Sequence, residues 1–178
     1  MTNPDFSPGV HTLAMKNLII ILLATSLLSA CEIFGDRPVT ISSSCDMVCK
    51  SGGADPLKGS DPAPDQTCIV YNFDDDSTLT LMHYNAGFNC CPEKILTDVR
   101  VTGDSLIITE KGKVLGCKCN CLFHVELKVY NLKPRIYHVR FEEDLFVPDT
   151  SRLVFDINLK DAPGGNACVM RANYPWGL

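Results

Sequence analysis

The stretch that decides the fold reads Cys117-Lys-Cys-Asn-Cys-Leu-Phe-His-Val-Glu-Leu-Lys-Val-Tyr130. Three cysteines stand at alternate positions from Cys117 to Cys121, and apolar residues continue the same alternation as far as Val129. Because successive side chains of an extended chain point to opposite faces, residues two apart share a face. The pattern predicts one long strand whose sulfurs and apolar side chains are directed into the interior of a β-structure.

Shorter segments with strand character lie on both sides of this stretch, and turn signals rich in Gly, Asp, Asn and Pro separate them. No segment shows a helical period. We therefore predict an all-β fold, an antiparallel and disulfide-rich β-sandwich of seven or eight strands that occupies residues 67–178. The expected strands lie at 68–71, 78–84, 95–101, 106–109, 117–130, 136–141, 153–159 and 167–170.

Residues 131–139 carry a second fold signal, since they read Asn-Leu-Lys-Pro-Arg-Ile-Tyr-His-Val. They resemble the Leu-x-Pro…Tyr-x-Val corner of fibronectin type III and other immunoglobulin-like domains. The resemblance implies an immunoglobulin-like sandwich with a corner at Leu132 and Pro134, in which the Tyr137 hydroxyl bonds to the chain upstream. Val139 stands where antibody domains have their second cysteine. The corner implies no ligand or partner.

The N-terminal segment looks like a targeting signal. A basic start at Met15-Lys16 is followed by an apolar run and by Leu28-Ser-Ala-Cys31, which resembles the lipobox of bacterial lipoproteins. The run is short for a membrane-spanning helix, which needs roughly 20 apolar residues. The resemblance implies that residues 1–30 are a signal peptide, with 1–14 an upstream extension, and that Cys31 becomes the acylated first residue.

Acylation at more than one position of Cys31 would give stable anchoring. We therefore expect a lipid-anchored protein of the cell envelope. An Asp after the lipidated cysteine favours the inner membrane in Gram-negative lipoproteins, and Glu32 stands there. The resemblance then implies the outer membrane if the cell is Gram-negative. Residues 31–66 are predicted to be a lipidated tether and a loop, in which Cys45 and Cys49 either attach the loop to the main body or close a local bridge.

Nine cysteines follow Cys31, and cysteines of exported proteins usually form disulfides. Residues two apart on a strand have parallel side chains, so the three alternating cysteines should pair outward rather than with one another. A bend could direct the adjacent Cys90 and Cys91 towards two of them. The remaining connectivity stays open, and an odd number leaves one thiol unaccounted for. The nine are Cys45, Cys49, Cys68, Cys90, Cys91, Cys117, Cys119, Cys121 and Cys168.

A metal site is the alternative interpretation of the central cysteines. Cys90 or Cys91 together with Cys117, Cys119 and Cys121 would supply four sulfurs, as zinc, copper(I) or an iron–sulfur cluster requires. The Cys-x-Cys-x-Cys spacing differs from the usual Cys-x-x-Cys pair, and an oxidising compartment favours disulfides. We therefore expect disulfides and no cofactor.

The rest of the chain carries no recognisable catalytic motif. The net charge of −5 and the lack of a basic cluster argue against binding to nucleic acid. The acidic runs 74–76 and 142–144 are predicted to be solvated turns, and His83, His124 and His138 to be surface or satisfied strand histidines. The predicted function is a structural or binding accessory module without catalytic activity, attached to the membrane through its lipid, with another envelope protein as the candidate partner.

Overall fold

Nine β-strands and no α-helix are present in the residues that the computed structural model describes, which confirms the all-β prediction. These residues are 38–50, 61–75, 77–114, 117–145, 148 and 151–176, with only the backbone described at 46–50 and 114. They belong to one compact unit, Pro38–Leu178. None of the described segments is a helix long and apolar enough to span a membrane. The predicted signal peptide and Cys31 lie outside the described residues.

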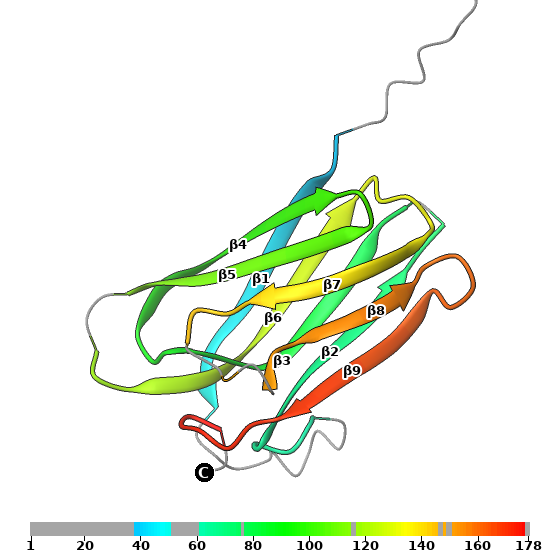
Figure 1. Ribbon diagram of the computed structural model, residues 1–178. Helices are drawn as coiled ribbons and strands as arrows, with labels where there is room; N and C mark the ends of the chain where they lie inside the picture. The colour runs from blue at the N-terminus through cyan, green and yellow to red at the C-terminus, as the bar shows by residue number, and fades with distance from the viewer. Residues whose placement is uncertain are drawn as a thin grey trace, which may run out of the picture. The chain divides into compact units, whose positions relative to one another are not determined.

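The strands form two layers, and the sheet with β4, β5, β7 and β8 lies in front of the other in Figure 1. The five-stranded sheet has the order β1-β6-β3-β2-β9, and the four-stranded sheet has the order β4-β5-β7-β8. The strands are β1 (Thr40–Lys50), β2 (Gln66–Phe73), β3 (Leu79–Asn89), β4 (Pro92–Thr102), β5 (Ser105–Val114), β6 (Asn120–Tyr130), β7 (Ile136–Glu142), β8 (Val154–Asn158) and β9 (Gly164–Met170).

Two features differ from the predicted sandwich. The strands number nine among the described residues because Thr40–Lys50, expected to be part of the tether, forms β1 and pairs antiparallel with β6. This segment has too few apolar residues to show a strand pattern, and the partner strand supplies its hydrogen bonds. The compact unit accordingly begins at Pro38 rather than at residue 67. The sheets are also not purely antiparallel, since β5 and β7 run parallel.

Strand β6 is an inner strand of the larger sheet, because it pairs with both β1 and β3. Its alternate residues from Cys121 to Val129 are buried, which confirms the predicted inward face. The strand begins only at Asn120. Cys117 and Cys119 therefore precede it, and Cys119 is exposed, so the expected continuous row of three inward sulfurs is wrong. The residues before β6 instead leave the sheet to meet Cys90 and Cys91.

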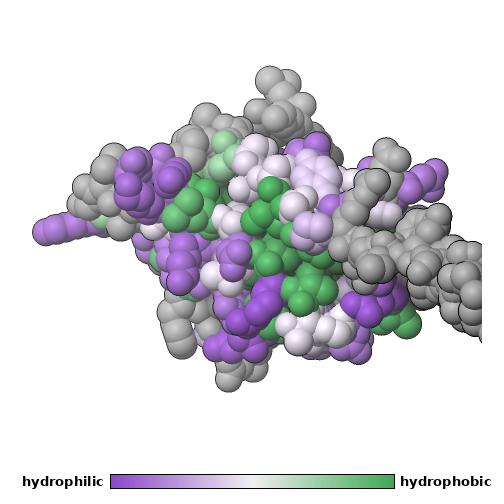
Figure 2. All heavy atoms as spheres, turned by 90° about the horizontal axis from the view of Figure 1, so that it is seen from above, coloured by the Kyte–Doolittle hydropathy of each residue, from purple (hydrophilic) through white to green (hydrophobic). Residues whose placement is uncertain are grey.

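The main core lies between the sheets and is built from the apolar alternate residues of β2, β3, β5, β6, β7 and β8. A second buried cluster, with Phe88 and Phe123 edge to face at 6.1 Å, adjoins the cysteines at the start of β4. Figure 2 looks onto the end of the sandwich where β1 begins, and hydrophobic atoms gather in the middle of this view among hydrophilic ones.

The predicted corner is present, but it is held differently from the expectation. Leu132 and Tyr137 are each 1% exposed and belong to the main core, whereas Pro134 is exposed. Within the described part of the chain the Tyr137 hydroxyl has no hydrogen-bond partner. The Leu132 N–H donates instead to the Ser77 carbonyl over 3.0 Å. The Asn131 side chain, in a left-handed residue with φ 61°, donates to the Pro38 carbonyl over 2.9 Å.

Trp176 closes the opposite end of the sandwich and is 2% exposed. Its indole N–H donates to the carbonyl of Asn85 over 2.8 Å. Asn85 lies at an irregularity of β3 with φ 56°, and its amide group donates to the carbonyls of Pro62, Ala63 and Gln66. This network attaches the segment before β2 and the C-terminal residues to the same point of β3.

Replacing Gly87 by Ala should destabilise this end by about 1–3 kcal/mol, the usual cost of overpacking. A Cβ at position 87 would lie 2.5 Å from a ring carbon of Trp176, and a buried indole cannot move aside cheaply. Chemical denaturation, together with the emission wavelength of Trp176, measures both effects. Gly164→Ala is the matched control for an added methyl group, because the nearest atom to its Cβ position, the Tyr71 carbonyl oxygen, lies at an ordinary contact distance of 3.5 Å. Unchanged stability and emission in Gly87→Ala would contradict the prediction.

Candidate functional site

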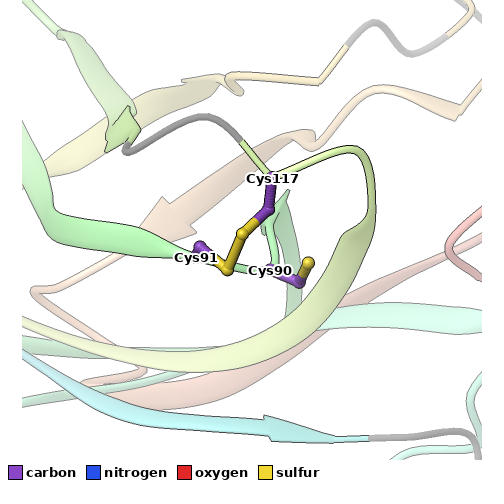
Figure 3. Close-up of side chains that lie close together, drawn as sticks. All are labelled: Cys90, Cys91 and Cys117. Carbon is purple, nitrogen blue, oxygen red and sulfur yellow. A yellow bond between two sulfur atoms is a disulfide. The ribbon is translucent and has the colours of Figure 1, made fainter.

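The candidate site lies where the connection from β3 to β4 meets the residues that precede β6. Cys90 and Cys91 occupy the bend between Asn89, the last residue of β3, and Pro92, the first of β4. Cys90 is bonded to Cys119 and Cys91 to Cys117. Figure 3 shows the Cys91–Cys117 bridge with the Cys90 sulfur leaving the chain in another direction. The prediction that a bend pairs the adjacent cysteines with two of the alternating ones is confirmed.

Four further cysteines are described beside this pair of bridges. Cys68 on β2 and Cys168 on β9 face each other in register and form a disulfide across the two strands. Cys121 on β6 is also disulfide-bonded and is buried. Cys45 on β1 is partly buried and packs against the same apolar cluster as Cys90. The side chains of Cys31 and Cys49 lie outside the described residues.

Three of the five cysteines considered as metal ligands come together. The sulfurs of Cys90, Cys91 and Cys117 lie within 4.8 Å of one another, and all three residues are partly buried. Neither Cys119 nor Cys121 belongs to this group. The sulfurs are engaged in disulfides, so the arrangement described is the oxidised one. A three-sulfur cluster formed by two neighbouring bridges was not evident from spacing, because it depends on how the β3–β4 bend is turned.

A buried ionic pair joins the two sheets at a second place. His83 on β3 and Glu110 on β5 are each 1% exposed, with 2.8 Å between Nδ1 and Oε2. The Thr67 hydroxyl donates to the Tyr84 carbonyl over 3.1 Å, and its oxygen lies 2.8 Å from His83 Nε2. With its hydrogen on the Tyr84 carbonyl, the Thr67 oxygen accepts from Nε2, while Nδ1 faces the Glu110 carboxylate. This arrangement suits an imidazolium, which carries hydrogens on both ring nitrogens.

The electrostatic surroundings of His83 agree with this hydrogen-bond pattern. Burial acts to lower the pKa of His83, but the Coulombic attraction and hydrogen bond of Glu110, with a further contribution from Glu143, outweigh it. Arg171 acts in the opposite direction. The pKa of His83 is therefore raised above its ordinary value of 6.5. A charged histidine is stabilised here by a carboxylate that burial has also removed from water.

Arg171 and Glu143 form a second buried pair, with 2.6 Å between Nη2 and Oε2 and side chains that are 0% and 4% exposed. Within the acidic run 142–144, predicted to be a solvated turn, Glu143 is therefore a buried ion-pair partner, and that prediction is wrong for this residue. Glu142 behaves differently, since hydrogen bonds from Arg140 and Thr109 lower its pKa near the surface. Five buried polar atoms have no partner in the described structure, and four of them belong to these ionic pairs: Glu110 Oε1, Glu143 Oε1, Arg171 Nε and Arg171 Nη1, with Thr97 Oγ1 the fifth.

The chain of hydroxyl, imidazole and carboxylate resembles catalytic triads only in composition. Thr67 is 0% exposed and its hydrogen is engaged by a backbone carbonyl, so the hydroxyl has neither access to a substrate nor a proton to transfer to His83. Its evident role is structural, because it connects β2, β3 and β5. The sequence signal for the ionic pair was that His83 and Glu110 each continue an apolar alternation, after Leu81 and Ile108 respectively.

The other two predicted strand histidines are partnered nearer the surface. His124 on β6 lies 3.2 Å from Asp61, which helps to hold the segment before β2 against the sheet. His138 on β7 lies 2.7 Å from Asp156 on β8, and both side chains are more than half exposed. These contacts agree with the expectation of satisfied or surface histidines.

Comparisons of the chain with protein-family models, with curated proteins and with solved structures found no match.

Proposed function

We propose that this chain is a lipid-anchored protein of the cell envelope, in which a disulfide-stabilised β-sandwich acts as a structural or binding module without catalytic activity. The observation that carries the proposal is the oxidised state of the sandwich, in which seven cysteines of the described part are disulfide-bonded. Such a density of disulfides is typical of compartments outside the cytosol. The lipobox-like segment ending at Cys31 would deliver the chain to such a compartment.

The position of the sandwich in the sequence supports anchoring close to a membrane. Only residues 32–37 separate Cys31 from Pro38, where the compact unit begins. An extended chain spans at most about 3.3–3.6 Å per residue, so this connection reaches about 25 Å. A sandwich held on so short a connection would meet partners that are themselves at the membrane surface, such as other envelope proteins.

The exposed hydrophobic residues of the sandwich support attachment through the lipid rather than through a protein surface. They are distributed over six strands and the ends of the unit, and isolated exposed hydrophobic residues are normal on soluble domains. The net charge of −5 adds no attraction to anionic lipids or to nucleic acid. The exposed hydrophobic residues are Val39, Ile41, Val70, Leu96, Ile136, Val154, Met170 and Tyr174.

The proposal predicts that Cys31→Ser abolishes lipid attachment. Wild-type protein should incorporate a palmitate analogue, partition with membranes and have an intact mass that includes the acyl groups. The Cys31→Ser protein should lack the label, because serine offers no thiol for diacylation. The measurement is metabolic labelling in a bacterium with the lipoprotein pathway, followed by fractionation and mass spectrometry.

An uncleaved signal could itself hold Cys31→Ser at the membrane, so a second variant replaces residues 1–30 of this mutant with a cleavable secretory signal. That protein should be soluble within the envelope. Cys49→Ser, which alters a cysteine outside the lipobox, should keep the label. Unlabelled wild-type protein, or membrane retention of the protein released from the secretory signal, would refute the lipid anchor.

A further inference from the structure

The two adjacent disulfides place four sulfur atoms in one small region. The sulfurs of Cys90, Cys91 and Cys117 lie within 4.8 Å of one another, and Cys119 is attached to Cys90 through the second bridge. The three-sulfur group contains no carboxylate and no imidazole. Its chemistry is therefore that of a soft ligand set, which selects soft metal ions over Mg²⁺ or Ca²⁺.

The backbone around these sulfurs is held by hydrogen bonds that do not depend on the S–S bonds. The Asn89 side-chain amide donates to the Cys117 carbonyl over 2.7 Å, and its Oδ1 accepts from the Cys91 N–H over 3.1 Å. The Cys90 N–H donates to the Cys119 carbonyl over 3.0 Å. One asparagine thus connects both cysteine-bearing segments through hydrogen bonds that use none of the sulfur atoms.

A second clamp acts on the residue that follows Cys119. The Tyr174 hydroxyl accepts from the Asn120 N–H over 3.0 Å and donates to the Asn120 carbonyl over 2.8 Å. Asn120 also pairs with Asn89 in the β3–β6 ladder. The segment before β6 is therefore fixed at its C-terminal end by side-chain and main-chain bonds. Such preorganisation is what a metal site needs, because ordering of the ligands then costs little at the moment of binding.

We infer that this cluster becomes a thiolate site for Cu(I) once the two disulfides have been reduced. Cys90, Cys91 and Cys117 are the ligands, and three thiolates match the low coordination number that Cu(I) accepts. Metal–sulfur bonds of about 2.3 Å place ligand sulfurs about 4 Å apart. The Cys91 and Cys117 sulfurs are bonded to each other in the oxidised protein and move apart by about 2 Å to reach that spacing once their bridge opens, while the Cys90 sulfur already lies within 4.8 Å of both. The inference does not rest on the lipid anchor, and it goes beyond the structural role proposed for the oxidised sandwich.

The reductive step requires a dithiol as co-reactant. One thiolate of the dithiol attacks a sulfur of the bridge and forms a mixed disulfide, and its second thiolate then displaces the protein thiol. Each protein disulfide takes up two electrons and two protons and becomes two cysteine thiols, while the dithiol becomes a disulfide. Cu(I) then replaces the protons of the three ligand thiols, which are released to solvent.

The inference is tested with full-length protein that has been reduced anaerobically with a phosphine, freed of reductant by gel filtration, and titrated with Cu(I) against a competing chelator. The reduced wild type should bind about one Cu(I) per chain, with thiolate-to-copper absorption in the ultraviolet and native β-type circular dichroism. The Cys91→Ser/Cys117→Ser protein should bind about 100-fold more weakly or less, because two of the three ligands are gone.

Cys68→Ser/Cys168→Ser is the matched control, because it removes the same number of thiols from a bridge outside the cluster. It should bind Cu(I) like the reduced wild type. Asn89→Ala keeps every thiol and removes the connection between the two segments, and its affinity should fall about 10-fold. Equal affinities in the two double variants, or an Asn89→Ala affinity equal to wild type, would overturn the inference.

Two other results would also overturn it. A reduced chain that lacks native circular dichroism and does not regain it on adding Cu(I) has no preorganised site. Tighter binding of Zn²⁺ than of Cu(I), measured with zinc alone in a parallel titration, would show a four-sulfur tetrahedral site that includes Cys119 in place of the three-sulfur site proposed.

Discussion

Replacing Arg171 by Met is expected to lower the free energy of unfolding by about 3–5 kcal/mol. Met retains much of the apolar length of the arginine side chain, so little packing is lost. The substitution leaves the Glu143 carboxylate, 4% exposed, without the guanidinium that lies 2.6 Å from it. One oxygen of that carboxylate already has no partner in the described structure. The carboxylate then keeps the Coulombic attraction of His83 but loses its hydrogen-bonded counter-ion, and burial leaves it no water to compensate.

Urea denaturation at pH 7 measures this loss. Circular dichroism is the better probe, because the Arg171 guanidinium lies 5.0 Å from the centre of the Trp176 ring and its removal alters the fluorescence directly. The double variant Arg171→Met/Glu143→Met should recover most of the stability, since removal of both buried charges is often neutral.

An exposed ion pair serves as the comparison for this experiment. Lys113 and Glu93 are 2.8 Å apart, but their side chains are 56% and 46% exposed. Lys113→Met should therefore change stability by less than about 1 kcal/mol. If Arg171→Met cost no more than Lys113→Met, the prediction that the buried pair stabilises the fold would be wrong.

The second large effect is a loss of stability as the pH rises, carried by His83 and Glu110. The folded-state pKa of His83 is raised above 6.5, so the folded protein holds the proton more tightly than the unfolded chain does. The contribution to stability is fully present below about pH 6.5 and is lost as the pH rises through the folded-state pKa. Denaturation midpoints measured from pH 6 to pH 9 should fall along the series.

Glu110→Gln should remove this pH dependence and lower the stability at pH 6 by about 3 kcal/mol, because the imidazolium loses its buried counter-charge. At pH 9 the gap between this variant and the wild type should be smaller, since the wild type has by then lost most of the same contribution. Glu143 raises the pKa of His83 and Arg171 lowers it, so the comparison is made with both of these residues unchanged.

His138→Ser is the control for the pH series, because His138 also lies beside a carboxylate but is 57% exposed. Its denaturation midpoints should follow those of the wild type from pH 6 to pH 9. If the denaturation midpoint still fell with rising pH in Glu110→Gln, or no longer fell in His138→Ser, the pH dependence would belong to a group other than His83.

Local pattern was sufficient for much of the fold. The alternation from Cys121 to Val129 predicted the buried face of β6, because period-two spacing on a strand specifies a face wherever the strand lies. The same reasoning did not extend to Cys117 and Cys119, since alternation alone does not say where a strand begins. It also missed β1, whose Thr, Ser and Cys residues become a strand only through pairing with β6.

At the candidate site, too, the sequence predicted some features and could not predict others. The adjacency of Cys90 and Cys91 and the alternation of Cys117, Cys119 and Cys121 were enough to predict that the adjacent pair would bridge to two of the three, since i and i+2 cysteines on an extended chain cannot readily bridge each other. Which two of the three would pair, and with which partner, was left open. The gathering of three sulfurs within 4.8 Å was not predictable, because it depends on a bend held by the Asn89 side chain.

The sequence by itself determined the all-β class, the inward face of β6 and the pairing of Cys90 and Cys91 with two of the three alternating cysteines, because these follow from contacts between near neighbours and from the alternation of side chains. Only the tertiary structure decided the parallel contact of β5 with β7, the place of β1, and the burial of His83, Glu110, Glu143 and Arg171. Charged residues are buried only where a partner from a distant strand compensates the lost hydration, and such a partner is invisible until the two sheets are packed together.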